Sequence, residues 1–114
     1  MEKSKNLLDI IIVNYKSTDY LINCLRSIFD SANGTPIRVF VQDNNSKDGI
    51  DRVNTRFTRV HVTENSHNLG FARAVNRALA QCTAPYLLIL NPDTIVFDGF
   101  FDIGLGRFDG LLNE

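Results

Sequence analysis

One stretch constrains the fold of this chain more than any other, an unbroken apolar run that ends directly in a polar turn. Residues 86–90 read Tyr-Leu-Leu-Ile-Leu and are followed by Asn-Pro-Asp-Thr at 91–94. An apolar run of this length, bounded by prolines, predicts a central parallel strand that is buried on both faces. Asp93 then lies at the carboxyl end of that strand, where open α/β sheets bind ligands. Taken alone, the same four residues are equally well an ordinary turn.

The rest of the chain alternates strand-like and helix-like patterns. Strands are expected at 8–13, 37–42 and around 60–62, with the last nearer an edge of the sheet. Together with the strand at 86–90 this gives a β-α-β-α-β-α-β order, which predicts an α/β fold with a mostly parallel sheet flanked by helices. The positions expected on the inner faces of the three helices are Leu21, Ile22, Leu25, Ile28 and Phe29, then Ile50, Val53 and Phe57, then Phe71, Val75, Ala78, Leu79 and Cys82.

Bulk properties narrow the class of protein. A chain of 114 residues with a net charge of −1 is expected to form one domain, 1–114, without a basic face for nucleic acid. Cys24 and Cys82 are too few for a disulfide framework or a zinc site and are expected to fill the core in a reducing compartment. The apolar run at 7–13 is too short to span a bilayer. We therefore expect a cytoplasmic protein, and peripheral membrane association stays open.

The segment after Phe97 has no clean period. Apolar residues continue to Leu112, but glycines at 104, 106 and 110 each disfavour a helix. The tail at 101–114 is therefore either a marginal helix or an apolar patch that requires another surface.

Polar residues collect after three of the predicted strands, at 14–15, 43–48 and 91–94. In a parallel sheet these loops emerge at one edge, which makes that edge the expected binding site. Neither Gly-x-Gly-x-x-Gly nor Gly-Lys-Ser/Thr occurs, so a dinucleotide fingerprint and a P-loop are excluded. Because the carboxylate of Asp93 repels phosphate, a phosphorylated ligand requires a bridging divalent cation.

Four segments carry a resemblance to a known family: 11–17 (IIVNYKS), 41–49 (VQDNNSKDG), 65–72 (NSHNLGFA) and 88–94 (LILNPDT). In order and spacing they resemble the family 2 glycosyltransferases with the GT-A fold, and most of all the rhamnosyltransferase-like branch. The resemblance covers about residues 8–100, the donor-nucleotide half of such enzymes. Relative to the family, the chain is truncated after the DxD-type motif.

The resemblance implies roles for particular residues. Asn14 and Tyr15 would lie beside the nucleotide base, and Asp43 would accept a hydrogen bond from the base or ribose. Asp93 would hold Mg²⁺ or Mn²⁺, with Asn91 near the ribose. Asp48 is interpreted as a hydrogen-bonded loop residue, and His67 and Asn68 as surface and turn residues. The complete set of expected nucleotide-binding residues is Asn14, Tyr15, Asp43, Asn45, Gly70, Arg73, Asn91 and Asp93.

Two departures from the family pattern matter. Many members carry an arginine two residues before the asparagine equivalent to Asn76, or just before it, but here Val75 immediately precedes Asn76. Arg73 is the alternative, although a solvated helix face is an equal interpretation. The acceptor-binding half is missing, and none of the late acidic residues stands in a recognisable context. No catalytic base is therefore assigned.

The resemblance implies metal-assisted, inverting transfer of a sugar from a UDP- or dTDP-linked donor to a saccharide or lipid-linked saccharide. A second copy or another chain would complete the acceptor site, so a homodimer is one expectation, and the inner face of the membrane is a candidate location. The alternative is a truncated, non-catalytic module that binds nucleotide or another protein, to which the apolar tail would dock.

Overall fold

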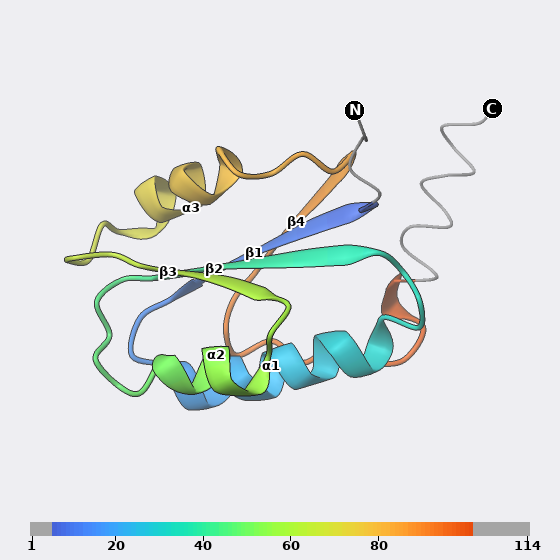
Figure 1. The fold of residues 1–114 in the computed structure, drawn as a ribbon, viewed down its shortest axis with the longest axis horizontal. Helices are drawn as coiled ribbons and strands as arrows, with labels where there is room; N and C mark the ends of the chain where they lie inside the picture. Colours follow the sequence, from blue (N-terminus) through green and yellow to red (C-terminus); the bar gives the residue numbers. More distant parts are fainter. Residues whose placement is uncertain (1–5, 102–114) are drawn as a thin grey trace.

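The computed structural model describes residues 6–101, so all but the first residue of the tail at 101–114 lies outside the described residues. Four parallel strands form one sheet in the order β3-β2-β1-β4 (Figure 1). No helix among residues 6–101 is long and apolar enough to cross a membrane. The elements are β1 (Leu8–Asn14), α1 (Thr18–Ser31), β2 (Ile37–Asp43), α2 (Asp51–Arg56), β3 (Val60–Glu64), α3 (Phe71–Leu79) and β4 (Tyr86–Leu90).

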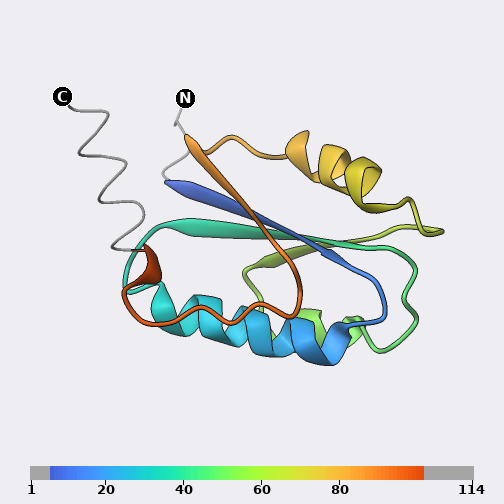
Figure 2. The ribbon, with the colours of Figure 1, turned by 180° about the vertical axis from the view of Figure 1, so that it is seen from behind.

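The sheet lies between two helical layers. Helices α1 and α2 cover one face and α3 covers the other, as both views show (Figures 1 and 2). The side chains of β1 alternate between the two layers, because successive residues of a strand point to opposite faces. Ile10 and Ile12 pack in the larger core under α1, whereas Ile11 packs with Phe40 and Val75 under α3. The predicted α/β fold with helices on both faces is confirmed.

The position of the strand at 86–90 corrects one prediction. β4 forms where the apolar run predicts, but within the described residues it is an edge strand, and β1 is central. Leu88 and Leu90 pack against the α1 core, while Leu87 and Ile89 remain 46% and 41% exposed. The opposite face is open because α3 packs over β1 and β2 instead. A continuous apolar run shows that both faces of a strand are apolar, but does not show that both are covered.

Helix boundaries follow the local signals. α1 begins after Ser17, and the chain leaves it through Asn33 and Gly34, whose φ values of 48° and 82° are left-handed. Cys24 is buried within α1, while Cys82 is partly buried beside the smaller core, and both thiols are free.

A second prediction, that Phe71 and Leu79 lie on the inner face of helix α3, is wrong. Its inner face is made by Ala74, Val75 and Ala78, while Phe71 and Leu79 are exposed. Leu79 follows Ala78 directly and so points roughly 100° away from it around the helix. The small inner side chains allow α3 to approach the sheet closely.

A partly buried ion pair, whose carboxylate is fully buried, holds the chain that leads into β4. Asp9 of β1 is fully buried and accepts hydrogen bonds of 3.0 Å from both Nε and Nη2 of Arg38 on β2. It also accepts the backbone N–H groups of Thr83 and Ala84, at 2.8 and 2.9 Å. Burial raises the pKa of Asp9, but the bonds from Arg38 and the two N–H groups outweigh that effect and hold the pKa below its usual value.

We predict that Asp9→Asn lowers the free energy of unfolding by about 2 kcal/mol near neutral pH, because Arg38 loses its charged partner. A group whose folded-state pKa is depressed stabilises the fold fully above its unfolded-state pKa of about 3.9. That contribution is lost as the pH falls through the folded-state pKa, so the difference between the variant and the wild type should shrink in acid. Urea denaturation from about pH 7 downward measures this, with the exposed Asp30→Asn as control. A difference independent of pH would contradict the assignment.

Candidate functional site

A hollow lies at the carboxyl edge of the sheet, above the neighbouring ends of β1 and β2. The register places Asn14 directly opposite Asp43, so the loops that follow the two strands emerge side by side. Together they border an open hollow of about 600 Å³. The predicted convergence of loops is thus observed for the first two of the three. The lining residues are Tyr15, Lys16, Asn45, Ser46, Lys47 and Asp48.

A buried hydrogen-bond network supports the floor of this hollow. Asp43 is 1% exposed, and its Oδ1 accepts hydrogen bonds from Asn14 Nδ2 at 2.9 Å and from Ser46 Oγ at 2.7 Å. Its Oδ2 accepts the backbone N–H of Ser46 at 3.1 Å, and Ser46 Oγ accepts the N–H of Lys16 at 2.7 Å. The side chains of Ser46 and Asp43 therefore lock the two loops together. A carboxylate oxygen can accept more than one hydrogen bond, so Oδ2 keeps capacity for a ligand donor.

The backbone of the hollow is held in an unfavourable conformation. Lys16, Asn45 and Lys47 have φ values of 54°, 61° and 54°, in the left-handed region that β-carbons disfavour. Asn tolerates this conformation, but lysine has no special reason to adopt it. Such residues cluster at ligand sites, where surrounding contacts impose the geometry. Here the bonds made by Ser46 supply those contacts.

Asp48 caps a helix. Its Oδ2 accepts the backbone N–H of Thr18 at 3.1 Å, and its Oδ1 accepts the hydroxyl of the same residue. The negative charge therefore lies at the N-terminus of α1, where the helix dipole favours it. The interpretation of Asp48 as a hydrogen-bonded loop residue is confirmed.

The loop before α3 is tied to the same edge by amide side chains. Asn65 Nδ2 donates to Gln42 Oε1 and to Asn44 Oδ1, both at 3.0 Å, and Asn44 Nδ2 donates to the carbonyl of Gly70 at 3.2 Å. A β-carbon at Gly70 would meet nothing within 4 Å, so glycine is favoured there by its φ of 83° and not by crowding. Asn68 Oδ1 accepts the N–H of Gly70 at 2.8 Å, which confirms its interpretation as a turn residue.

Sequence reasoning missed the residues that build this edge. Ser46, Asn44 and Asn65 lie inside the motif segments but were assigned no role. The sequence feature that could have identified them is a small polar side chain in a loop that directly follows a buried strand. At such a position buried polar groups need hydrogen-bond partners. Within the described residues two buried acceptors have no partner, Asn14 Oδ1 and Asn65 Oδ1, and both are at this edge.

The remaining expected site residues lie apart from the hollow. Asn91 and Asp93 are exposed in the turn after β4, closed by a 3.1 Å bond from Thr94 N–H to the Asn91 carbonyl. Burial raises the pKa of the Cys24 thiol to about 11, and the charge of Asp93 adds to this effect. Arg73 is exposed on α3.

Metal-binding groups are sparse. Residues 6–101 contain no group of three or more His, Cys, Asp or Glu side chains that could hold a metal ion. A cation at Asp93 would therefore depend on oxygen atoms of a ligand. That is the usual mode of Mg²⁺, which binds one or two carboxylates together with substrate phosphates. The exposed single carboxylate fits this mode.

The chain belongs to glycosyl transferase family 2, whose family model matches residues 9–110. The recognition of this family from its four motif segments is confirmed. Among curated proteins, the chain is 28% identical, over an alignment of 120 residues, to N-acetylglucosaminyl-diphospho-decaprenol L-rhamnosyltransferase of Mycobacterium tuberculosis. The alignment covers 95% of this chain but 36% of that protein, so the chain spans about a third of the relative's length.

Solved structures show the same fold. Residues 1–349 of S. aureus TarS superpose with a TM-score of 0.81 at 20% identity, covering 91% of this chain and 32% of that one, and the same protein is known in complex with UDP. The mannosyltransferase PcManGT of Pyrobaculum calidifontis, in complex with GDP-Man and Mn²⁺, gives a TM-score of 0.70 at 22% identity. The match covers 82% of this chain and 29% of that one. The α/β domain of the GT-A type is thus confirmed.

We predict that Lys47→Gly raises the free energy of unfolding by roughly 1 kcal/mol, because glycine adopts a left-handed φ without strain. Lys47→Val should lower it, since a β-branched side chain is least tolerant of this region. Lys47 is exposed, so packing changes little in either variant. Thermal denaturation followed by circular dichroism measures both variants. Changes of the same sign in their unfolding temperatures would contradict backbone strain at Lys47.

Proposed function

We propose that this chain forms the donor-nucleotide half of a glycosyltransferase that moves a sugar from a nucleotide diphosphate sugar to an acceptor hydroxyl. Family membership implies nucleotide-sugar transfer, and two proteins of the same fold are known with UDP or with GDP-Man and Mn²⁺. One observation carries the proposal for this chain, the 600 Å³ hollow at the carboxyl edge of β1 and β2. Its position agrees with the rule for ligand sites in open α/β sheets.

The lining of the hollow suits a nucleotide. Tyr15 is 45% exposed and offers a ring on which a base can stack, while Lys16 Nζ lies 5.3 Å from the ring centroid. Lys16 and Lys47 supply positive charge for a diphosphate. Asp43, with its remaining acceptor capacity, would receive a hydrogen bond from the base or ribose. The roles inferred for Asn14, Asn45, Gly70, Arg73 and Asn91 complete this set.

Asp93 would hold Mg²⁺ or Mn²⁺ together with the diphosphate of the donor. When bound, the cation neutralises charge that develops on the leaving diphosphate. The carboxylate of Asp93 contributes a fixed ligand on an exposed turn beside the end of β1, since Leu90 pairs with Ile12. Inversion at the sugar would require a base that deprotonates the acceptor, and we assign none within this chain.

We further propose that residues 1–114 act as one nucleotide-sugar-binding unit and that additional polypeptide, in a second copy or another chain, binds the acceptor. The acceptor class would be a saccharide or a lipid-linked saccharide, and the reaction would take place in the cytoplasm or at the inner face of the membrane. The β4 edge favours self-association, because within residues 6–101 the strand pairs on one side only, with β1, and carries the exposed side chains of Leu87 and Ile89. A non-catalytic binding module is the second candidate, favoured by the same exposed edge.

We predict that UDP or dTDP binds in calorimetric titration only when Mn²⁺ is present, and that Asp93→Asn weakens this binding roughly tenfold or more, about 1.4 kcal/mol. The reason is that the substitution removes the fixed negative ligand of the cation. Asp98→Asn is the matched control, since Asp98 is an exposed carboxylate in the same segment. Equal affinities of wild type and Asp93→Asn would contradict the metal site, and no binding by the folded wild type would contradict the donor site.

We predict that the protein dimerises through β4 as its concentration rises in sedimentation velocity, and that Ile89→Lys shifts it toward monomer, because charge on an edge strand opposes pairing. Phe97→Lys is the control, since Phe97 is 77% exposed but lies outside the strand. A monomer at every concentration, or equal effects of both variants, would contradict pairing through β4. Turnover of a nucleotide sugar by the assembled protein separates the enzyme from the binding module.

A further inference from the structure

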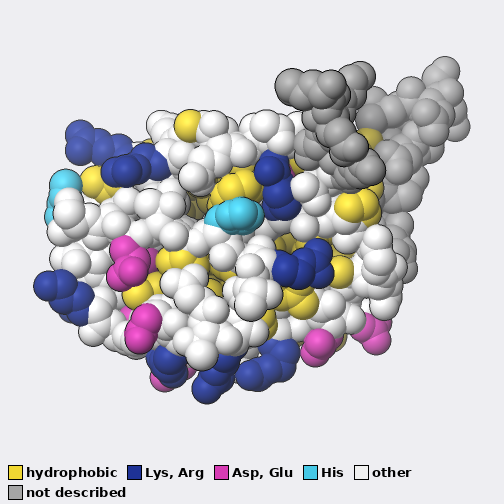
Figure 3. Space-filling model, in the orientation of Figure 1, with side chains coloured by type: hydrophobic (Ala, Val, Ile, Leu, Met, Phe, Trp, Pro, Cys, Tyr) yellow, Lys and Arg dark blue, Asp and Glu magenta, His cyan; other side chains and the backbone are white. Residues whose placement is uncertain are grey.

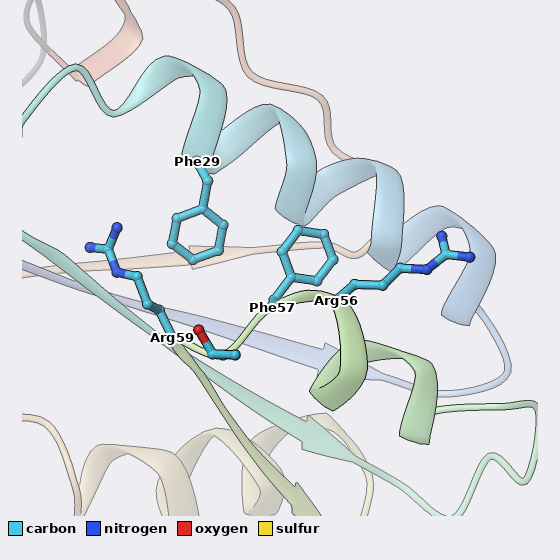
Figure 4. A pocket seen from close by; sticks show the side chains of 5 residues that line it. Phe29, Arg56, Phe57 and Arg59 are labelled. Carbon is cyan, nitrogen blue, oxygen red and sulfur yellow. The ribbon is translucent and has the colours of Figure 1, made fainter.

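A second hollow, of about 210 Å³, lies between the end of α1 and the segment that joins α2 to β3 (Figure 4). Its floor is a stacked pair of rings, Phe29 and Phe57, with centroids 5.9 Å apart and planes inclined by 23°. Both rings pack against the larger core but remain partly exposed. The floor is therefore apolar and accessible.

Two arginines flank this floor. The guanidinium of Arg59 lies 5.2 Å from the centroid of Phe29, whereas Arg56 lines the hollow beside Phe57 with its side chain extending away from the two rings (Figure 4). Both side chains are exposed, and among residues 6–101 neither forms an ion pair with a carboxylate. Arg38 and Arg52, by contrast, each pair with an aspartate. Among residues 6–101, the rim of the hollow is thus positive and its two arginines have no carboxylate partner. On this face of the molecule dark blue Lys and Arg side chains lie beside yellow hydrophobic ones (Figure 3).

The position of this hollow separates it from the proposed nucleotide site. Arg59 immediately precedes β3, and Phe29 lies near the end of α1, so both belong to the amino edge of the parallel sheet. The loops around Asp43 belong to the opposite edge. A volume of 210 Å³ is below the 300–1,000 Å³ usual for small-molecule pockets, and it suits a single side chain.

We propose that this hollow is a docking site for a protein partner that inserts one aromatic side chain flanked by carboxylates. The stacked rings would receive the aromatic anchor, and Arg56 and Arg59 would pair with the acidic residues on either side. Arginine and aromatic residues are the types that dominate interface energetics. Charge complementarity selects an acidic segment, and the size of the hollow selects a single anchor. Occupancy of this site does not depend on nucleotide binding.

The test uses the peptide N-acetyl-Glu-Phe-Glu-amide, titrated into the full 114-residue protein and followed by NMR on the aromatic signals of Phe29 and Phe57. We expect saturable shifts of both rings, weakened by added salt because the contacts are exposed. The double variant Arg56→Gln/Arg59→Gln should weaken binding of the peptide roughly fivefold, because it removes two exposed ion pairs with the glutamates. Arg77→Gln, which removes an exposed arginine from α3 on the other face of the sheet, should leave it unchanged.

Three results of the peptide titrations would overturn the proposal. They are an absence of saturable shifts at the two rings, equal binding of N-acetyl-Lys-Phe-Lys-amide, and equal binding of N-acetyl-Glu-Ala-Glu-amide. An absence of shifts would exclude the site. Equal binding of the lysine peptide would exclude selection by charge, and equal binding of the alanine peptide would exclude the aromatic anchor. Binding to phosphatidylglycerol vesicles through the same two arginines, without peptide binding, would also overturn it in favour of a membrane surface. Because both arginines are exposed, the variants are expected to fold, and circular dichroism checks this directly.

Discussion

The carboxyl edge of this sheet depends on one buried carboxylate. Asp43 ends β2 directly opposite Asn14 at the end of β1, and it accepts hydrogen bonds from Asn14 and Ser46. Ser46 in turn accepts the backbone N–H of Lys16, so two loops that are distant in sequence become one rigid rim. Burying a carboxylate is costly unless it is hydrogen-bonded, and both oxygens of Asp43 accept hydrogen bonds from this network. The left-handed lysines and the hollow they line are consequences of this arrangement.

Much of the fold was predictable, because the spacing of apolar residues shows which face of each strand or helix is apolar. The four strands, the three helices and the turn at Asn33 and Gly34 follow from local pattern. The exposure of Leu87 and Ile89 was not predictable, because coverage of a strand depends on which neighbour packs there and not on its own residues. Asp9 illustrates the same limit, since its partners Arg38, Thr83 and Ala84 are brought together only by the sheet.

The site was predictable in part. Strand order alone places the loops after Asn14 and Asp43 at one edge, and the hollow is found there. Asp48 was expected to be a hydrogen-bonded loop residue, and it caps α1. The nucleotide-binding role expected of Asp43 stays a prediction, and its carboxylate is buried and hydrogen-bonded within the loops. The role of Ser46 could not be read from the sequence, because one hydroxyl in a polar loop looks like any other until its partners are known. The turn that carries Asp93 lies outside the hollow. The two would therefore be connected by a ligand that contacts both.

The most direct measurement of the central claim is an amide NMR spectrum recorded with UDP, first with Mg²⁺ and then with Mn²⁺. If the hollow binds the nucleotide, UDP with Mg²⁺ should shift the signals of Tyr15, Lys16 and residues 45–48. Paramagnetic Mn²⁺ should then broaden the signals of residues 91–94 only when UDP is present, since Asp93 and the diphosphate share the cation. Shifts confined to other surfaces, or broadening at Asp93 that does not require UDP, would contradict the account.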